Sequence, residues 1–118
     1  IKKLIKKKYN TKVYSCLTVR DQNKVALSSR NVLLKKNDIK KSSYIAKLLF
    51  KFKNNLKKNI SNKKNLNTII LKLNKIKNIK VEYLEIRNKN NLSKLYDKRN
   101  FKIFLAYYNK KIRLIDNY

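Results

Sequence analysis

The sequence predicts an α+β fold in which two helices pack on a small three-stranded antiparallel sheet. Apolar residues recur at three-, four- and seven-residue spacing in two segments, 36–56 and 66–76, as they do on the buried face of an amphipathic helix. Three runs rich in strand-forming residues follow, at 81–87, 101–108 and 112–115. Helices followed by consecutive strands suggest an α+β arrangement.

The length of the chain allows one modest hydrophobic core. With 118 residues it has the size of one domain, and 42% of the residues are hydrophobic, enough to offset chain entropy when they are patterned in this way. Disorder, which the 33% of charged residues would favour, is therefore the weaker interpretation. The pattern suggests no internal repeats.

The first residues are predicted to form the end of a helix and then a mostly buried strand. Ile1, Leu4 and Ile5 share one helical face, and residues 12–19 contain the strand-forming run Val-Tyr-Ser-Cys-Leu-Thr-Val. Cys16 is the single cysteine, which excludes an intrachain disulfide. We interpret it as a buried apolar residue.

The segment between this strand and the first helix is predicted to be a loop. Residues 20–31 are rich in hydroxyl and amide side chains and show no strong periodicity. The helix that follows begins near Lys36, so Lys35 takes the N-cap position, where lysine is a poor residue. Residues 54–65 are polar and rich in lysine, and are predicted to connect the two helices.

The last two strands, 101–108 and 112–115, are predicted to form a hairpin. Asn109 lies between them and is the predicted turn residue, because asparagine tolerates a positive φ and the chain contains no glycine.

The charge of the chain raises the question of a polyanionic partner. The 33 Lys and Arg residues against 6 Asp and Glu give a net charge of +27, which suggests nucleic acid or an anionic surface. Gly, Pro, Met, Trp and His are all absent, however, so the lysines fit a chain-wide drift in composition. Arginine binds phosphate in a bidentate manner better than lysine, so the five arginines are more informative. They are Arg20, Arg30, Arg87, Arg99 and Arg113.

The composition also excludes several kinds of site. Without histidine and with one cysteine, the chain cannot build a Cys/His metal site or a Cys-His nucleophile pair, and we predict no metal ligands. No apolar run approaches the roughly 18 residues of a membrane span, and no signal-peptide core follows Ile1, which indicates a soluble cytoplasmic protein without a membrane partner. Because the sequence opens with Ile1 and not with Met, we expect a piece of a longer protein.

Residues 27–31, Leu-Ser-Ser-Arg-Asn, are the most suggestive short segment. Two adjacent hydroxyls beside a guanidinium can bind phosphate oxygens through neutral and charge-assisted hydrogen bonds. Such a tetrapeptide occurs by chance in many loops, so by itself it favours a solvated loop over a phosphate site.

Four short sequence segments change this interpretation, because together, and in this order along the chain, they resemble the pantothenate synthetases (pantoate–β-alanine ligases). They are Cys-Leu-Thr-Val-Arg-Asp at 16–21, Val-Ala-Leu-Ser-Ser-Arg-Asn-Val at 25–32, Tyr-Leu-Glu-Ile at 83–86 and Arg-Leu-Ile-Asp-Asn at 113–117. The resemblance implies that residues 1–21 end a Rossmann-like nucleotide-binding domain and that residues 22–118 form a C-terminal domain that covers ATP. For the last two blocks, a structural role in strands is the better interpretation.

The resemblance implies an ATP-dependent ligase that joins pantoate to β-alanine through pantoyl adenylate and releases AMP and pyrophosphate, with Mg²⁺ bound to the ATP. The backbones of Val19 and Leu27 are expected at the adenine, and Ser28, Ser29 and Arg30 at the phosphates. Arg30 is the expected catalytic residue, because an arginine brought in by loop closure stabilises charge in the transition state. The family's catalytic histidines belong to the missing N-terminal domain, so the piece alone should be inactive, and the full-length enzyme is expected to form homodimers through that domain.

The sequence departs from the family pattern in three places that shape the backbone. Leu17 replaces a proline, Lys24 a glycine, and residues 35–36 a Ser-Pro pair, and the lost helix cap costs about 1 kcal/mol. Two alternatives remain: a small basic nucleic-acid-binding protein such as a ribosomal protein, and a decayed relic of the same enzyme. The ordered blocks and the scarcity of arginine weigh against a nucleic-acid partner.

Overall fold

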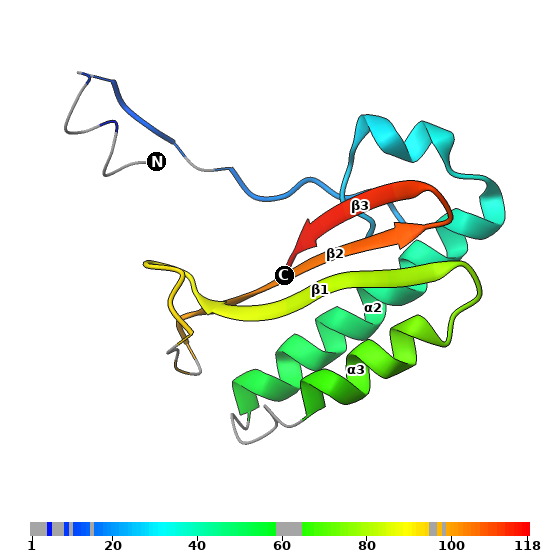
Figure 1. The fold of residues 1–118 in the computed structure, drawn as a ribbon. Coiled ribbons are helices and arrows are strands. Elements are labelled where there is room, and N and C mark those ends of the chain that lie inside the picture. Colours follow the sequence, from blue (N-terminus) through cyan, green and yellow to red (C-terminus); the bar gives the residue numbers. More distant parts are fainter. Residues whose placement is uncertain are drawn as a thin grey trace.

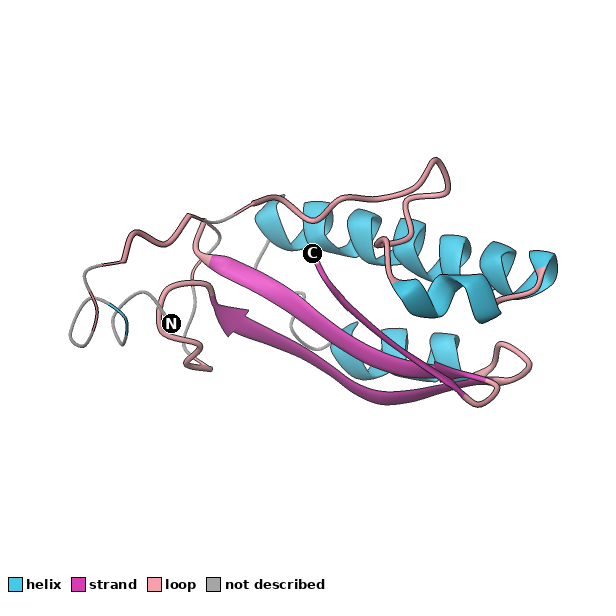
Figure 2. Cartoon of the chain, turned by 90° about the horizontal axis from the view of Figure 1, so that it is seen from above, coloured by secondary structure: helices cyan, strands magenta, loops and turns pink. Residues whose placement is uncertain are grey.

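The computed structural model describes residues 5, 9, 11–14, 16–58, 65–94, 97 and 99–118. The secondary-structure elements follow one another along the chain in this order: a 3₁₀ helix η1 (Ser29–Leu33), helices α2 (Lys36–Lys58) and α3 (Asn65–Asn74), and strands β1 (Ile79–Asn88), β2 (Phe101–Asn109) and β3 (Ile112–Asn117). The strands form one antiparallel sheet in the order β1-β2-β3. Figure 1 shows α2 and α3 side by side along the sheet, and Figure 2 shows that both cover the same face. The α+β prediction is confirmed.

The apolar stripes of the two helices meet the sheet, as their periodicity predicts. Ile45, Leu49 and Leu56 of α2 and Leu73 of α3 are completely buried. Because Leu56 is anchored in the core, α2 continues to Lys58, and the predicted connector at 54–65 therefore begins too early.

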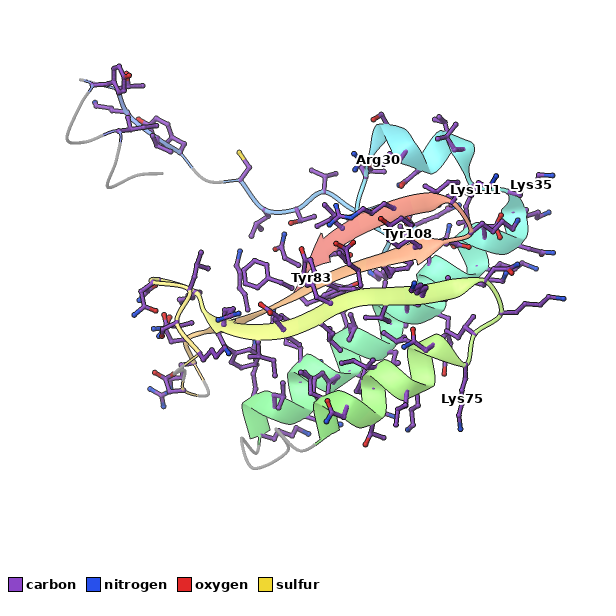
Figure 3. The ribbon with its side chains drawn as sticks, viewed as in Figure 1. Arg30, Lys35, Lys75, Tyr83, Tyr108 and Lys111 are labelled. Carbon is purple, nitrogen blue, oxygen red and sulfur yellow. The ribbon has the colours of Figure 1, made fainter. Side chains whose placement is uncertain are left out.

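The central strand β2 supplies the middle of the core. Ile103 and Leu105 are completely buried beneath the helices, and Leu84 of β1 lies opposite Leu105 in the register. The alternate residues Tyr83 and Tyr108 lie on the face of the sheet that the helices leave open (Figure 3).

The predicted role of Asn109 as the turn residue is wrong. Asn109 is the last residue of β2 and is completely buried, and the positive φ of the two-residue turn, 57°, belongs to Lys110. The Asn109 amide donates to the Asp38 carbonyl at 3.0 Å and lies 3.5 Å from the Ser42 hydroxyl. The asparagine is therefore needed to join the hairpin to the start of α2, and the exposed lysine takes the turn.

The prediction of a buried strand at 12–19 is also wrong. Residues 11–14 and 16–19 have no regular secondary structure; Cys16 is exposed, and Leu17 is 93% exposed. No strand of the described sheet lies beside them, and the Val19 carbonyl accepts instead from the Leu27 N–H, next to an isolated bridge between Arg20 and Ala26. Of the predicted helix at 1–8, only Ile5 belongs to the described residues, and it is helical.

Asp38 stabilises the N-terminus of α2, where the Lys35 side chain provides no cap. Lys35 accepts the hydrogen bond of the Ile39 N–H at 3.0 Å, as an N-cap residue does, but its side chain cannot cap. Asp38 is 3% exposed and lies in the first helical turn, where a negative charge is favourable. Its Oδ2 accepts from the Lys110 Nζ at 2.7 Å, and its Oδ1 lies 3.6 Å from the Lys41 Nζ.

These contacts predict a loss of stability in acid. The Lys110 hydrogen bond, aided by the lysine charges, holds the pKa of Asp38 below its ordinary value of 3.8. A pKa that is lower in the folded state contributes stability above the unfolded value, and this contribution is lost as the pH falls through the folded value. Urea unfolding between pH 7 and pH 2 should show Asp38→Asn less stable than the parent at pH 7 and less sensitive to acid below about pH 4. Asp97→Asn, at an exposed site, should keep the parent's acid dependence; equal curves for Asp38→Asn and the parent would contradict the prediction.

Candidate functional site

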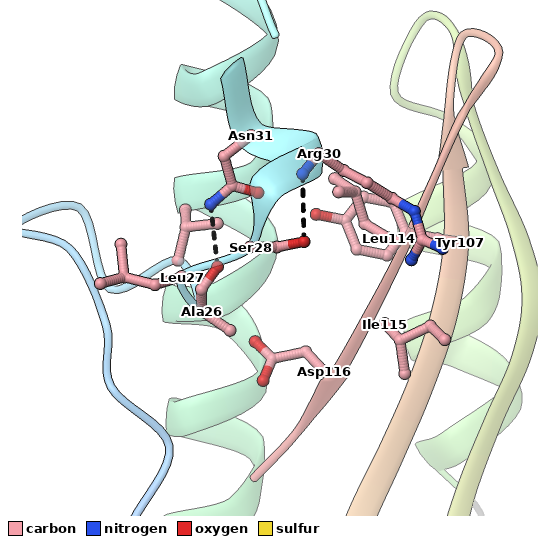
Figure 4. Close-up of a pocket in the computed structure, with 10 residues that line it drawn as sticks. Ala26, Leu27, Ser28, Arg30, Asn31, Tyr107, Leu114, Ile115 and Asp116 are labelled. Atoms are coloured by element: carbon pink, nitrogen blue, oxygen red, sulfur yellow. Dashed lines mark hydrogen bonds between the residues drawn. The ribbon is translucent and has the colours of Figure 1, made fainter. Parts of the chain in front are cut away.

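A pocket of about 230 Å³ lies between the loop before α2 and the edge strand β3. Figure 4 shows its two walls, one formed by the loop and η1, the other by the sheet. The loop wall consists of Val25, Ala26, Leu27, Ser28, Arg30 and Asn31, and the sheet wall of Tyr107, Leu114, Ile115 and Asp116.

The loop wall is shaped by a tight reversal of the chain at 19–27. The Leu27 N–H donates to the Val19 carbonyl at 3.0 Å, and the Asp21 N–H donates to the Val25 carbonyl at 2.9 Å. The Asp21 carboxylate accepts from two further backbone N–H groups inside the turn, those of Asn23 and Val25. Lys24 has a φ of 68°, a value that glycine adopts freely, which explains physically why the family pattern has glycine here. Lysine in this conformation costs about 1 kcal/mol.

The motif at 27–31 begins the 3₁₀ helix and does not remain a loop throughout. The Ser28 hydroxyl accepts from the Arg30 N–H at 3.3 Å, and the Asn31 side chain donates to the Ala26 carbonyl at 2.9 Å. The Arg30 guanidinium forms no ion pair with the described residues, and its residue is exposed. Arg30 therefore has a positive charge free to meet an anion at the pocket.

Three of the five predicted site residues line the pocket. Leu27, Ser28 and Arg30 do so, whereas Ser29 is exposed in the first turn of η1. Val19 is connected through its carbonyl to Leu27 and does not line the pocket. The structure thus brings residues 27–31, apart from Ser29, to the pocket beside the sheet, and Val19 does not line it.

The sheet wall contains residues that sequence reasoning missed. Tyr107 is 4% exposed, and burial raises its pKa to about 12, although a hydrogen bond with Ser42 opposes this. Its hydroxyl therefore keeps its proton at neutral pH. Asp116 is 8% exposed and pairs with Arg20. The sequence signals were the scarcity of arginine and the block at 16–21, for Arg20, and the block at 113–117, which was interpreted as structural, for Asp116.

The chemistry of the pocket suits an anion. Hydroxyl, amide and guanidinium groups lie on the loop wall, and the one carboxylate on the opposite wall is neutralised by its ion pair. Among the described residues, no group of three or more His, Cys, Asp or Glu side chains could hold a metal ion. No helix in the described part of the chain is long and apolar enough to cross a membrane.

These features define a small α+β domain that presents a Ser-Ser-Arg loop beside the edge of its sheet. The model of the family described as pantoate-beta-alanine ligase matches residues 1–118. The chain belongs to the pantoate-beta-alanine ligase family.

Relatives by sequence agree with the family match. A pantothenate synthetase of Endomicrobium trichonymphae is 37% identical over 92% of this chain and 38% of its own length. A pantothenate synthetase of Ruthia magnifica is 33% identical over 99% of this chain and 42% of its own length. The chain thus spans about two fifths of these relatives.

Solved structures share the fold. The pantoate-beta-alanine ligase of Francisella tularensis, complexed with β-γ ATP and β-alanine, superposes with a TM-score of 0.68 at 32% identity, covering 99% of this chain and 37% of that one. The pantothenate synthetase of Thermus thermophilus superposes with a TM-score of 0.74 at 22% identity, covering 99% of this chain and 43% of the other.

Proposed function

We propose that this chain is the C-terminal, ATP-covering part of an enzyme that condenses pantoate with β-alanine. The reaction proceeds through pantoyl adenylate, consumes ATP and releases AMP and pyrophosphate. The observation that carries the proposal is the position of Ser28 and Arg30 at the mouth of a pocket, in a chain that the family model matches throughout.

The size of the pocket supports a shared site. Ligand pockets usually measure about 300–1,000 Å³, and this pocket, at about 230 Å³, is too small to enclose ATP. One wall of the nucleotide site is therefore expected from this chain and the remainder from the part of the enzyme that precedes it. We assign residues 1–21 to the end of that preceding domain, and 22–118 to the cover. Leu17, 93% exposed, and Val19, 66% exposed, leave apolar surface for the preceding domain to contact.

The loop before α2 suits the parts of ATP in sequence order. Val19 and Leu27 are 66% and 60% exposed and are joined by a backbone hydrogen bond, and we assign their adjoining backbones to the adenine. Ser28, Ser29 and Arg30 follow at once and supply donors for the phosphates. We assign no protein ligand to Mg²⁺, because the described residues offer no cluster of carboxylates.

Arg30 is the residue that we assign to catalysis. When the pantoate carboxylate attacks the α-phosphate, negative charge increases between two anions. A guanidinium placed there stabilises the transition state more than the bound substrates, and so raises kcat. The exposed Arg30, without an ion pair among the described residues, is free to approach once the cover closes.

The remaining partners of the enzyme follow from the same proposal. The catalytic histidines are expected in the preceding domain, since this sequence contains none, and this chain alone should be inactive. Full-length subunits are expected to pair through that domain in the cytoplasm. Nucleic-acid binding, the alternative function, is favoured by the net charge of +27 and by the Tyr and Phe residues interleaved with Lys.

Pantoate-dependent exchange of labelled pyrophosphate into ATP by the full-length protein tests the proposal. Exchange should need pantoate and proceed without β-alanine, because adenylate formation is the first half-reaction. A folded full-length protein that shows no exchange would contradict the ligase function. Steep, salt-dependent RNA binding by the same protein would then support the alternative.

A further inference from the structure

The Arg20 guanidinium hydrogen-bonds both to a carboxylate and to backbone carbonyls. Its two terminal nitrogens donate to the two carboxylate oxygens of Asp116 at 2.7 and 2.8 Å, a bidentate ion pair. The same nitrogens also donate to the carbonyls of Lys24 at 2.9 Å and Asn117 at 2.8 Å. One guanidinium thus joins the loop at 20–24 to the last strand, which is 96 residues further along the chain.

Two aromatic rings enclose this guanidinium. Its central carbon lies 4.9 Å from the ring centre of Phe50 and 4.8 Å from that of Tyr118, and the rings meet edge to face at 5.1 Å. The Arg20 side chain is only 14% exposed. Burial opposes its charge, but the hydrogen bonds and charge of Asp116 outweigh burial and raise the pKa of Arg20. Such a geometry is specific to arginine, since lysine has neither the planar fork nor the flat faces.

The partner of Arg20 lies on the wall of the pocket. Asp116 lines it together with Ser28 and Arg30, so without Arg20 a carboxylate would face the place proposed for the phosphates. Like charges in a partly buried site repel more strongly than they do in water.

We propose that Arg20 is a positioning residue for ATP, with two effects that arise from the same contacts. It neutralises Asp116 on the pocket wall, and it fastens the loop that leads into residues 27–31 to strand β3. This inference rests on the proposed function for its ligand, whereas the fastening of the loop can be measured without activity.

Substituting the two partners of the ion pair should affect the KM for ATP of the full-length enzyme differently. Arg20→Gln leaves Asp116 charged and unpaired, so the KM for ATP should rise about tenfold. Asp116→Asn removes the repulsion and keeps an acceptor for Arg20, so the KM for ATP should stay the same or fall. The KM for β-alanine should not change in either variant. A purely structural ion pair would raise the KM for ATP alike in both, and that result would overturn the inference.

Hydrogen exchange separates failure of this inference from failure of the proposed function. The N–H groups of Val25 and Leu27 are bonded within the fastened loop, so Arg20→Gln should speed their exchange in the full-length protein. Arg20→Lys should also speed the exchange of these amides, because lysine keeps the positive charge but lacks the planar guanidinium that donates to two acceptors at once. If the parent enzyme lacks pyrophosphate exchange, the proposed function fails. Hydrogen exchange at these two amides then tests by itself whether Arg20 fastens the loop. Unchanged protection in Arg20→Gln would then overturn the fastening role.

Discussion

Replacing Arg30 with alanine should lower the rate of pantoyl-adenylate formation by about 10²–10³-fold, the effect of removing one preorganised donor from a charged transition state. The physical reason is that Arg30 has no ion pair among the described residues and lies at the pocket, so its charge is available to the reacting phosphate. Pyrophosphate exchange at saturating ATP and pantoate measures this step in the full-length enzyme. The loss should appear in kcat, because the interaction is made mainly in the transition state.

Two matched variants make the result specific. Arg99→Ala removes another exposed arginine, in the loop before β2, and should retain the parent rate. Arg30→Lys keeps the positive charge without the planar fork and should recover part of the loss. If Arg30→Ala exchanges at the parent rate, Arg30 does not act on the phosphates and the catalytic assignment is wrong.

Leu105→Ala should destabilise the fold by about 2–5 kcal/mol, the usual effect of truncating a buried leucine. Leu105 is completely buried in the central strand β2 and packs between Leu84 of the neighbouring strand and the helices. Small domains have a free energy of unfolding of about 5–15 kcal/mol, so this one change removes a large share of it. The change in urea midpoint measures it.

Leu71 provides the control for this prediction. It lies on the outer face of α3 and is 63% exposed, so Leu71→Ala should change stability by no more than about 0.5 kcal/mol. Equal losses for the two variants would mean that the core does not lie where the structure places it.

Helix and strand periodicity predicted most of the architecture, because both are local patterns and both mark the residues that are buried in the same hydrophobic core. The stripe through Ile45, Leu49 and Leu56 must be buried on one face, and a sheet with alternating residues provides that face. The same logic failed at 12–19, where strand propensity is high but the described residues offer no neighbouring strand. A strand requires a partner, and propensity does not supply one.

Long-range side-chain contacts could not be predicted in this way. Asn109 and Lys110 were both available for the turn, and only the position of Asp38, 71 residues away, decides that the asparagine is buried and the lysine exposed. Arg20 and Asp116 are likewise too far apart in the sequence for any spacing rule to join them.

The sequence by itself determined the α+β class, the order of the two helices and the three strands of the sheet, and the Ser-Ser-Arg motif, because each depends on neighbouring residues and on periodicity. The tertiary structure alone decided that Leu27, Ser28 and Arg30 share a pocket with Tyr107 and Asp116. It also decided that the fork of Arg20 neutralises the carboxylate there. These outcomes depend on how the edge of a sheet meets a loop that precedes it by more than 80 residues, which only packing of the whole domain determines.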